Sequence, residues 1–160
     1  MAVNRIDTVR LFGVNSVQTY ALLVDNLSPS QRTRSMRANT STGTRPERTV
    51  RKLLRQAHIR FRSQHKQLPG TPDFVLTENN VALFVHGCFW HSHGCAPARL
   101  PATNKPYWKR KLARNVARDR AVKQTLRKAG WRPVTLWECQ LRTLTPAKIL
   151  YIITARKAGR

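Results

Sequence analysis

The pattern of hydrophobic positions predicts a first well-defined helix in the middle of the chain. Val50, Leu53 and Leu54 recur at the spacing of one helical face. Thr44 precedes them, and Glu47 stands three residues after it, which is the arrangement of a capping box. We therefore expect a helix that begins at Thr44 and buries its apolar side.

Three apolar runs after this helix predict short strands. Residues 73–76 follow a Gly-Thr-Pro break, residues 81–85 follow an Asn-Asn turn, and residues 132–138 form the third run. A basic helical pattern covers about residues 108–129 and ends at a glycine, and a last helix is expected over about residues 146–157. This order predicts a small α/β sandwich with a mixed sheet.

The N-terminal part has a weaker pattern. Residues 1–27 show no clear period and are expected to be an extension of unknown role, which leaves residues 28–160 as the domain. Residues 28–31 predict a short helix start with a hydroxyl cap, and residues 32–45 are basic and poor in apolar groups. This basic stretch is either an arm that contacts phosphates or a solvated linker.

The net charge of the chain indicates the kind of partner that it binds. Its 160 residues contain 30 Lys+Arg and 7 Asp+Glu, for a net charge of +23. Such an excess predicts a polyanionic partner, and a merely basic soluble protein is the plainer alternative. A membrane role is disfavoured, because no long apolar run or basic amphipathic anchor is present.

The residues between 88 and 95, together with Cys139, contain the donors of a metal site. Cys88, His93 and Cys95 lie close together, and Cys139 follows the third predicted strand. Zinc favours four tetrahedral nitrogen and sulfur ligands, so a closed shell would hold the loop against the sheet as a structural site. Unligated buried cysteines are the alternative. With three cysteines and no secretory leader, we expect a reduced intracellular setting rather than disulfides.

Asp73 and two histidines are the candidates for catalysis. Asp73 starts a strand directly after a turn, where its carboxylate could bind Mg²⁺ through hard oxygen ligands. A turn-capping role is the alternative for this residue. His86 ends the second predicted strand and His91 lies in the following loop, and either imidazole could act as a general base or acid near neutral pH.

The remaining carboxylates have simpler explanations. Glu47 caps its helix, and it can also serve a site if the helix start faces a cleft. Asp119 and Glu138 stand near arginines and are expected to form ion pairs with them.

Three aromatic residues stand out because of their polar surroundings. Phe89 and Trp90 lie among the candidate metal ligands, and Trp108 heads the basic helix. Aromatic side chains beside cations can stack on bases or insert between base pairs, most easily where the duplex is already weakened. Packing around a small zinc site is the alternative. We call Phe89, Trp90 and Trp108 the aromatic trio.

Several blocks of the sequence together resemble the very-short-patch repair endonucleases, which nick DNA beside T:G mismatches. They extend over about residues 28 to 142, and the run at 86–91 (His-Gly-Cys-Phe-Trp-His) is the most specific. The matching blocks are residues 35–37, 68–74, 85–95, 101–104 with Trp108, 115–116 with 118–119, 130–132 and 137–139. The resemblance implies a restriction-endonuclease-like three-layer sandwich, a small mixed sheet flanked by helices, with a structural zinc and a magnesium-dependent active site.

The resemblance also implies roles for individual residues. It implies a zinc shell and an intercalating set: Cys88, His93, Cys95 and Cys139 for the zinc, and Phe89, Trp90 and Trp108 for the intercalation.

For the catalytic centre, the resemblance implies Asp73 as the Mg²⁺ ligand, helped by the main-chain carbonyl of Val85, a position that is commonly Thr in the family. His91 would activate the attacking water and His86 would assist at the scissile phosphate. Glu47 would support the network of metal-bound water.

The expected function is therefore Mg²⁺-dependent nicking of duplex DNA 5′ of a thymine mispaired with guanine, as arises when 5-methylcytosine deaminates. We expect a monomer in the cytoplasm of a bacterium or phage host, associated with the nucleoid and possible partner repair proteins. One rival is a nickase of the same fold with another duty, such as host defence. Another is a catalytically silent, zinc-stapled DNA-binding module.

Overall fold

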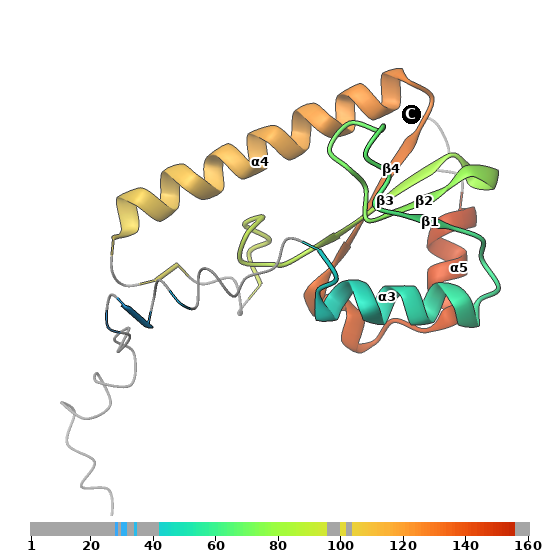
Figure 1. Ribbon diagram of the computed structural model, residues 1–160, viewed down its shortest axis with the longest axis horizontal. Helices are drawn as coiled ribbons and strands as arrows, with labels where there is room; N and C mark the ends of the chain where they lie inside the picture. Colours follow the sequence, from blue (N-terminus) through green and yellow to red (C-terminus); the bar gives the residue numbers. More distant parts are fainter. Residues whose placement is uncertain are drawn as a thin grey trace, which may run out of the picture.

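The computed structural model describes residues 28, 30, 31, 34, 42–95, 100, 101 and 104–155 (Figure 1). The predicted extension at 1–27, most of the basic stretch at 32–45 and the matching block at 35–37 lie outside these residues. Ser28 caps the short helical start as expected, because its Oγ accepts a hydrogen bond from the Gln31 N–H at 3.2 Å. No helix among the described residues is long and apolar enough to cross a membrane.

A four-stranded mixed sheet in the order β1-β2-β3-β4 forms the centre of the fold. The strands and helices are β1 Arg62–Ser63, β2 Phe74–Leu76, β3 Val81–His86, β4 Arg132–Trp137, α3 Arg45–Gln56, α4 Lys105–Lys128 and α5 Pro146–Thr154. The first three strands pair antiparallel, whereas β3 and β4 are parallel. Parallel neighbours need a crossover connection, and α4 provides it.

The sheet separates two hydrophobic clusters, which confirms the three-layer arrangement. Val50 and Leu54 of α3 and Ile149 of α5 belong to a cluster that also includes Leu83 of β3. On the opposite face, Leu126 of α4 packs in a second cluster with other β3 residues. Figure 1 shows α4 on one side of the sheet and α3 with α5 on the other. The expected α/β fold with a small mixed sheet is thus correct.

The side chains of the central strand β3 alternate between the two hydrophobic clusters. Val81 and Leu83 belong to the cluster on the α3 side, and Ala82 and Phe84 belong to the α4 side. This alternation follows from the two-residue period of a strand, and it explains why both faces are apolar. The same period directs His86, the last residue of β3, to the side of α4.

Two glycines shape turns next to α4, one at the end of the helix and one packed against its side. Gly130 has φ +77°, and the Trp131 N–H donates to the Leu126 carbonyl at 2.9 Å, which terminates α4 in a Schellman-type turn. Gly70 has φ +73°, and a Cβ there would lie only 2.4 Å from a methyl of Val122. The turn before Asp73 therefore packs against α4 so closely that only glycine fits.

Candidate active site and metal centre

Asp73 stands at the end of the sheet where β2 separates from β3. Its Oδ2 accepts a hydrogen bond from the Val85 main-chain N–H at 2.7 Å. Burial raises the pKa of Asp73 to about 6; the Val85 hydrogen bond opposes this shift, and the charge of Glu47 adds to it. Two carboxylates thus approach each other at the point where β3 ends.

Glu47 is buried, with 5% of its surface exposed, at the start of α3. Its Oε2 accepts from the Gly43 N–H at 2.8 Å, and its Oε1 accepts from the Thr44 hydroxyl at 2.8 Å. The expected capping box at Thr44 is therefore confirmed. Glu47 also lies close enough to Asp73 for its charge to raise the pKa of that carboxyl.

These two carboxylates fit a divalent cation. Among the described residues, neither Asp73 nor Glu47 forms an ion pair. A hard divalent ion prefers carboxylate oxygens and would relieve their mutual repulsion. The position of the Val85 carbonyl as a further ligand stays a prediction.

His91 and Asp119 form a hydrogen-bonded pair on the α4 side. His91 Nδ1 donates to Asp119 Oδ2, and the same oxygen lies 4.0 Å from His86 Nδ1. The rings of His86 and His91 are stacked, with centroids 3.6 Å apart and planes at 11°. A carboxylate on Nδ1 fixes the tautomer of His91 and leaves Nε2 as the proton acceptor.

His86 is held neutral in this arrangement. Burial is the main cause that lowers its pKa, to about 3, and the charge of His91 acts in the same direction. Lys123 and Arg118 lower it further, whereas Asp119 raises it. A neutral imidazole can donate one hydrogen bond and accept another, so His86 can contact a reacting group without carrying charge.

A cavity of about 460 Å³ opens beside the two histidines, and we call it the histidine cavity. His86, His91 and Asp119 line it together with Arg120, Lys123 and Arg127 of α4. Its walls therefore combine a possible general base with several cations.

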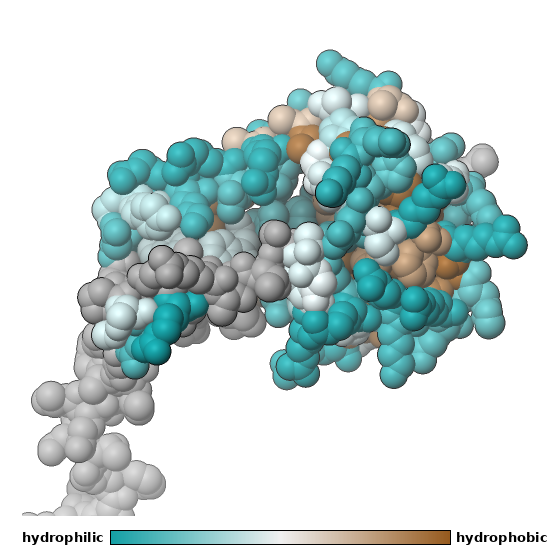
Figure 2. Space-filling view, in the orientation of Figure 1, coloured by the Kyte–Doolittle hydropathy of each residue, from teal (hydrophilic) through white to brown (hydrophobic). Residues whose placement is uncertain are grey.

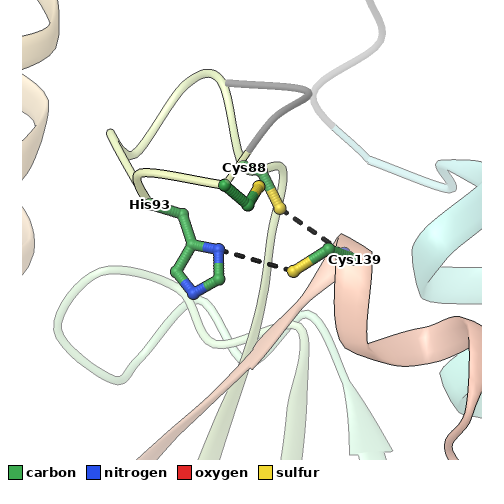
Figure 3. Close-up of side chains that lie close together, drawn as sticks. Cys88, His93 and Cys139 are labelled. Atoms are coloured by element: carbon green, nitrogen blue, oxygen red, sulfur yellow. Dashed lines mark hydrogen bonds between the residues drawn. The ribbon is translucent and has the colours of Figure 1, made fainter. Parts of the chain in front are cut away.

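Four candidate zinc ligands lie in one cluster, which joins the loop after β3 to the turn after β4. One donor atom each from Cys88, His93, Cys95 and Cys139 lies within 4.8 Å of the others. Cys139 Sγ is 3.4 Å from His93 Nδ1, and the Cys139 N–H contacts Cys88 Sγ at 3.4 Å (Figure 3). A tetrahedral zinc with ordinary bond lengths would separate a sulfur and a nitrogen ligand by about 3.6 Å, so the cluster fits zinc.

The surroundings of Cys139 disfavour its thiolate form. Removal from water, followed by the sulfurs of Cys88 and Cys95, raises the pKa of the Cys139 thiol to about 11. Zinc binds the thiolate form, so an ion at this position would reverse the shift.

The aromatic trio comes together in space although Trp108 is distant in sequence. The ring of Phe89 lies 5.0 Å from Trp90 and 5.2 Å from Trp108, measured between centroids. Lys111 Nζ lies 5.3 Å from the Trp90 ring centre and 5.4 Å from that of Trp108. All three rings are only half-buried. The structure thus forms one aromatic surface with a cation beside it.

Sequence reasoning missed two residues that organise the site. Asp119 does contact Arg118 at 3.6 Å, as expected, but its main partner is His91. Trp137, the last residue of β4, stacks on His93 with ring centroids 4.1 Å apart, and its ring centroid lies 5.5 Å from that of His86. Both stand in blocks that matched the family, which was the available signal.

The fold is a basic α/β sandwich, and its site combines clustered carboxylates, a histidine–carboxylate pair and a cysteine–histidine cluster. This combination defines an endonuclease that acts on DNA. Residues 24–97 match the family model described as DNA mismatch endonuclease Vsr. The chain belongs to this Vsr family, whose fold is restriction-endonuclease-like, and the expected family, fold class and enzyme class are confirmed. Endonucleases of this kind are expected to need a divalent metal.

Three relatives illustrate the similarity. The type II nicking enzyme V.XorIIP of Xanthomonas oryzae is 45% identical over 122 residues, which are 76% of this chain and 90% of that protein. The DNA mismatch endonuclease Vsr of Escherichia coli is 40% identical over 75% of this chain and 77% of its own. The type II nicking enzyme V.NmeAIP of Neisseria meningitidis is 35% identical over 75% of this chain and 86% of its own.

Proposed function

We propose that the protein nicks one strand of duplex DNA immediately 5′ of a thymine mispaired with guanine. The observation that carries this proposal is the His91–Asp119 pair, which stands beside β3 at the end where Asp73 contacts Val85. The residues that we propose as general base and as metal ligand thus both lie at this end of the sheet. The name of the Escherichia coli relative, a mismatch endonuclease, supports the choice of substrate.

Asp73 would hold the catalytic Mg²⁺, with the main-chain carbonyl of Val85 as a second ligand. Glu47 would accept hydrogen bonds from the metal-bound water, since its charge acts on the Asp73 carboxyl. When bound, the ion supplies neutralisation of the charge that develops on the phosphate and on the leaving oxygen. Valine at position 85 is compatible with this role because only the backbone is used.

His91 would take the proton from the attacking water through Nε2. Asp119 keeps Nδ1 protonated and stabilises the imidazolium that forms, as in other histidine–carboxylate pairs. His86, neutral and stacked on His91, would hydrogen-bond to the scissile phosphate. Its Nδ1 is buried and has no hydrogen-bond partner within the described part of the chain, so this ring can form a further hydrogen bond.

The aromatic trio would insert next to the mispair. Its three rings contact one another at the N-terminal end of α4 and are flanked by Lys111. Unstacking a base step costs a few kcal/mol, and a mismatch reduces this cost, so insertion would favour T:G over paired sites. The exposed face of α4 would follow the phosphates, and hydrophilic side chains cover it in Figure 2.

The cysteine–histidine cluster would hold a structural Zn²⁺ that fixes the loop bearing Phe89, Trp90 and His91. Cys88 follows β3 and Cys139 follows β4, at the same edge of this parallel pair, so the ion would tie the loop after β3 to the turn after β4 (Figure 3). With four protein ligands, no position remains for a reacting water. The ion would therefore hold the loop in place and take no part in the reaction.

A second candidate is a nickase that acts at a site without a mismatch. The names of the Xanthomonas and Neisseria relatives, type II nicking enzymes, favour this reading. A silent DNA-binding module is less consistent with the chain, because a binding module needs no hydrogen-bonded His91–Asp119 pair. We further infer that residues 28–160 act as a monomer in the cytoplasm, where the substrate arises by deamination of 5-methylcytosine.

A strand-labelled nicking assay tests these alternatives. Two duplexes that differ only in one T:G or C:G pair are incubated with Mg²⁺, or with the metal omitted. A Mg²⁺-dependent nick 5′ of the thymine, absent from the paired duplex, is the expected result. Equal nicking of both duplexes would replace the mismatch enzyme by the second candidate, and no nicking in any context or with any divalent metal would leave the binding module.

A further inference from the structure

Three cations of α4 point to a function for the histidine cavity beyond holding the general base. Arg120, Lys123 and Arg127 all line it and follow one another at spacings of three and four residues. Residues at these spacings share one face of a helix. This face of α4 therefore presents a row of positive charges toward His86 and His91.

The charges in the cavity are not balanced by protein groups. Asp119 is the one carboxylate among the residues that line it within the described chain. Both of its oxygens are engaged, Oδ2 with His91 and Oδ1 with Arg118 at 3.6 Å. The strand β3 contributes no Lys or Arg between Val81 and His86. The positive charge of the cavity thus comes from α4 and lacks an anion.

Lys123 is the most informative of these cations because it is half-buried. It stands four residues after Asp119, a spacing at which an ordinary helical ion pair would explain it. In the part of the chain that the structure describes, however, Lys123 forms no ion pair or hydrogen bond. Partial burial lowers its pKa, with Arg127 acting in the same direction and Asp119 opposing them. A cation in this position lacks the partner that its burial requires.

A metal ion is the wrong occupant for this cavity. His86, His91 and Asp119 do place one donor atom each within 4.8 Å of the others, as a metal site would need. A divalent cation there would face the charges of Arg120, Lys123 and Arg127 in the same cavity. Like charges at short range disfavour it, whereas an anion gains from all three. The electrostatics therefore select an anion.

We propose that the histidine cavity is a phosphate subsite in which Lys123, with Arg120 and Arg127 at its rim, binds one backbone phosphate of the strand that is nicked. A phosphodiester is small enough for the space of about 460 Å³ and carries the required charge. Bound there, it would place the strand against His91. This subsite rests on the proposed function, because it assumes that DNA is the substrate.

The test combines one protein change with the removal of one DNA charge. Lys123→Met removes the ammonium group and keeps a similar apolar stem. The matched control is Lys148→Met on α5, which changes net charge equally; the Lys148 Nζ contacts the Thr143 carbonyl at 3.2 Å on the other side of the sheet. Duplexes carry a single neutral methylphosphonate at successive positions around the nick. Binding is measured by fluorescence anisotropy without Mg²⁺, and kcat/KM is measured with it.

We expect Lys123→Met to weaken binding of the unmodified duplex about 10- to 100-fold, as the loss of a charge-assisted contact does. At one position, the methylphosphonate should weaken wild-type binding by a similar factor and weaken Lys123→Met no further. Lys123→Arg should restore most of the affinity. Lys148→Met should bind nearly as wild type, with the methylphosphonate effect undiminished at every position.

Full additivity of Lys123→Met with the methylphosphonate at every position would overturn the subsite, as would wild-type affinity of Lys123→Met for the unmodified duplex. The proposed function is judged separately, by nicking of the unmodified T:G duplex by the wild type. Coupling without nicking would refute that function and leave the subsite, and nicking without coupling would refute the subsite alone.

Discussion

Asp73→Asn should abolish nicking and yet stabilise the protein in the absence of Mg²⁺. The Asn side chain keeps the shape of Asp73 and can still accept the hydrogen bond from the Val85 N–H, which measures 2.7 Å in the wild type. What it removes is a carboxylate whose charge is disfavoured by burial and by Glu47. The carboxylate that we propose as the Mg²⁺ ligand therefore destabilises the metal-free protein.

The pKa of Asp73 gives the size and the sign of the effect. Its pKa rises from the ordinary 3.8 to about 6 on folding, so the folded protein binds the proton more tightly than the unfolded chain. Stability from this group is fully present below about pH 4 and is lost as the pH rises through about 6. The loss is on the order of 3 kcal/mol above pH 7, which corresponds to about 10 °C in Tm.

The measurement is thermal unfolding of zinc-loaded protein, dialysed free of Mg²⁺, at several pH values from 4 to 8. Asp73→Asn should melt higher than wild type at pH 8, and the difference should vanish near pH 4. Glu78→Gln is the control, because Glu78 is an exposed acid that pairs with Arg60 at 3.7 Å. Added Mg²⁺ should raise the Tm of wild type and not that of Asp73→Asn. Equal Tm values at pH 8, or a difference that persists at pH 4, would refute the reasoning.

Three further changes address the other parts of the site. Asp119→Asn should reduce kcat by about 10²- to 10⁴-fold, because the amide can donate to His91 Nδ1 and so leave Nε2 protonated; unchanged kcat in single-turnover nicking would contradict this role. Trp90→Ala should reduce the preference for T:G over paired duplex about 10-fold in competition binding, more than it reduces affinity for paired DNA; equal losses on both would exclude insertion as the source of selectivity. Cys139→Ser should lose zinc and lower the Tm together, as metal analysis and calorimetry would measure; a full zinc content in this variant would remove Cys139 from the ligand set.

The fold could be predicted largely because its strands and helices carry strong local patterns. The capping box at Thr44 and the glycine stop at Gly130 use local chemistry, and the structure confirms both. The strand β1 could not be predicted, because Arg62 and Ser63 are both exposed and show no apolar alternation. Helix α4 begins at Lys105, earlier than expected, since proline is tolerated in a first helical turn.

The cysteine–histidine cluster could be predicted from the sequence, whereas the His91–Asp119 pair could not. The chain has only three cysteines, and they lie at element ends or in a loop, so few arrangements could bring them together. Asp119 lies between Arg118 and Arg120, and the nearest charges suggested its partners. Its main partner, His91, is 28 residues away in a loop that only the tertiary fold places against α4. Local sequence favours the local ion pair, and packing decides otherwise.

Helix α4 carries Trp108 near its start and Asp119 near its middle, and Leu126 anchors its end in the core. Trp108 and Asp119 are eleven residues apart, about 16 Å along a rod with a rise of 1.5 Å per residue. A helix bends far less easily than a loop. If DNA displaces Trp108, the rigid helix would therefore also displace Asp119, the carboxylate that orients His91. Insertion of Trp108 into DNA and positioning of His91 would then be coupled. A substitution that kinks α4 between Trp108 and Asp119 would remove this coupling.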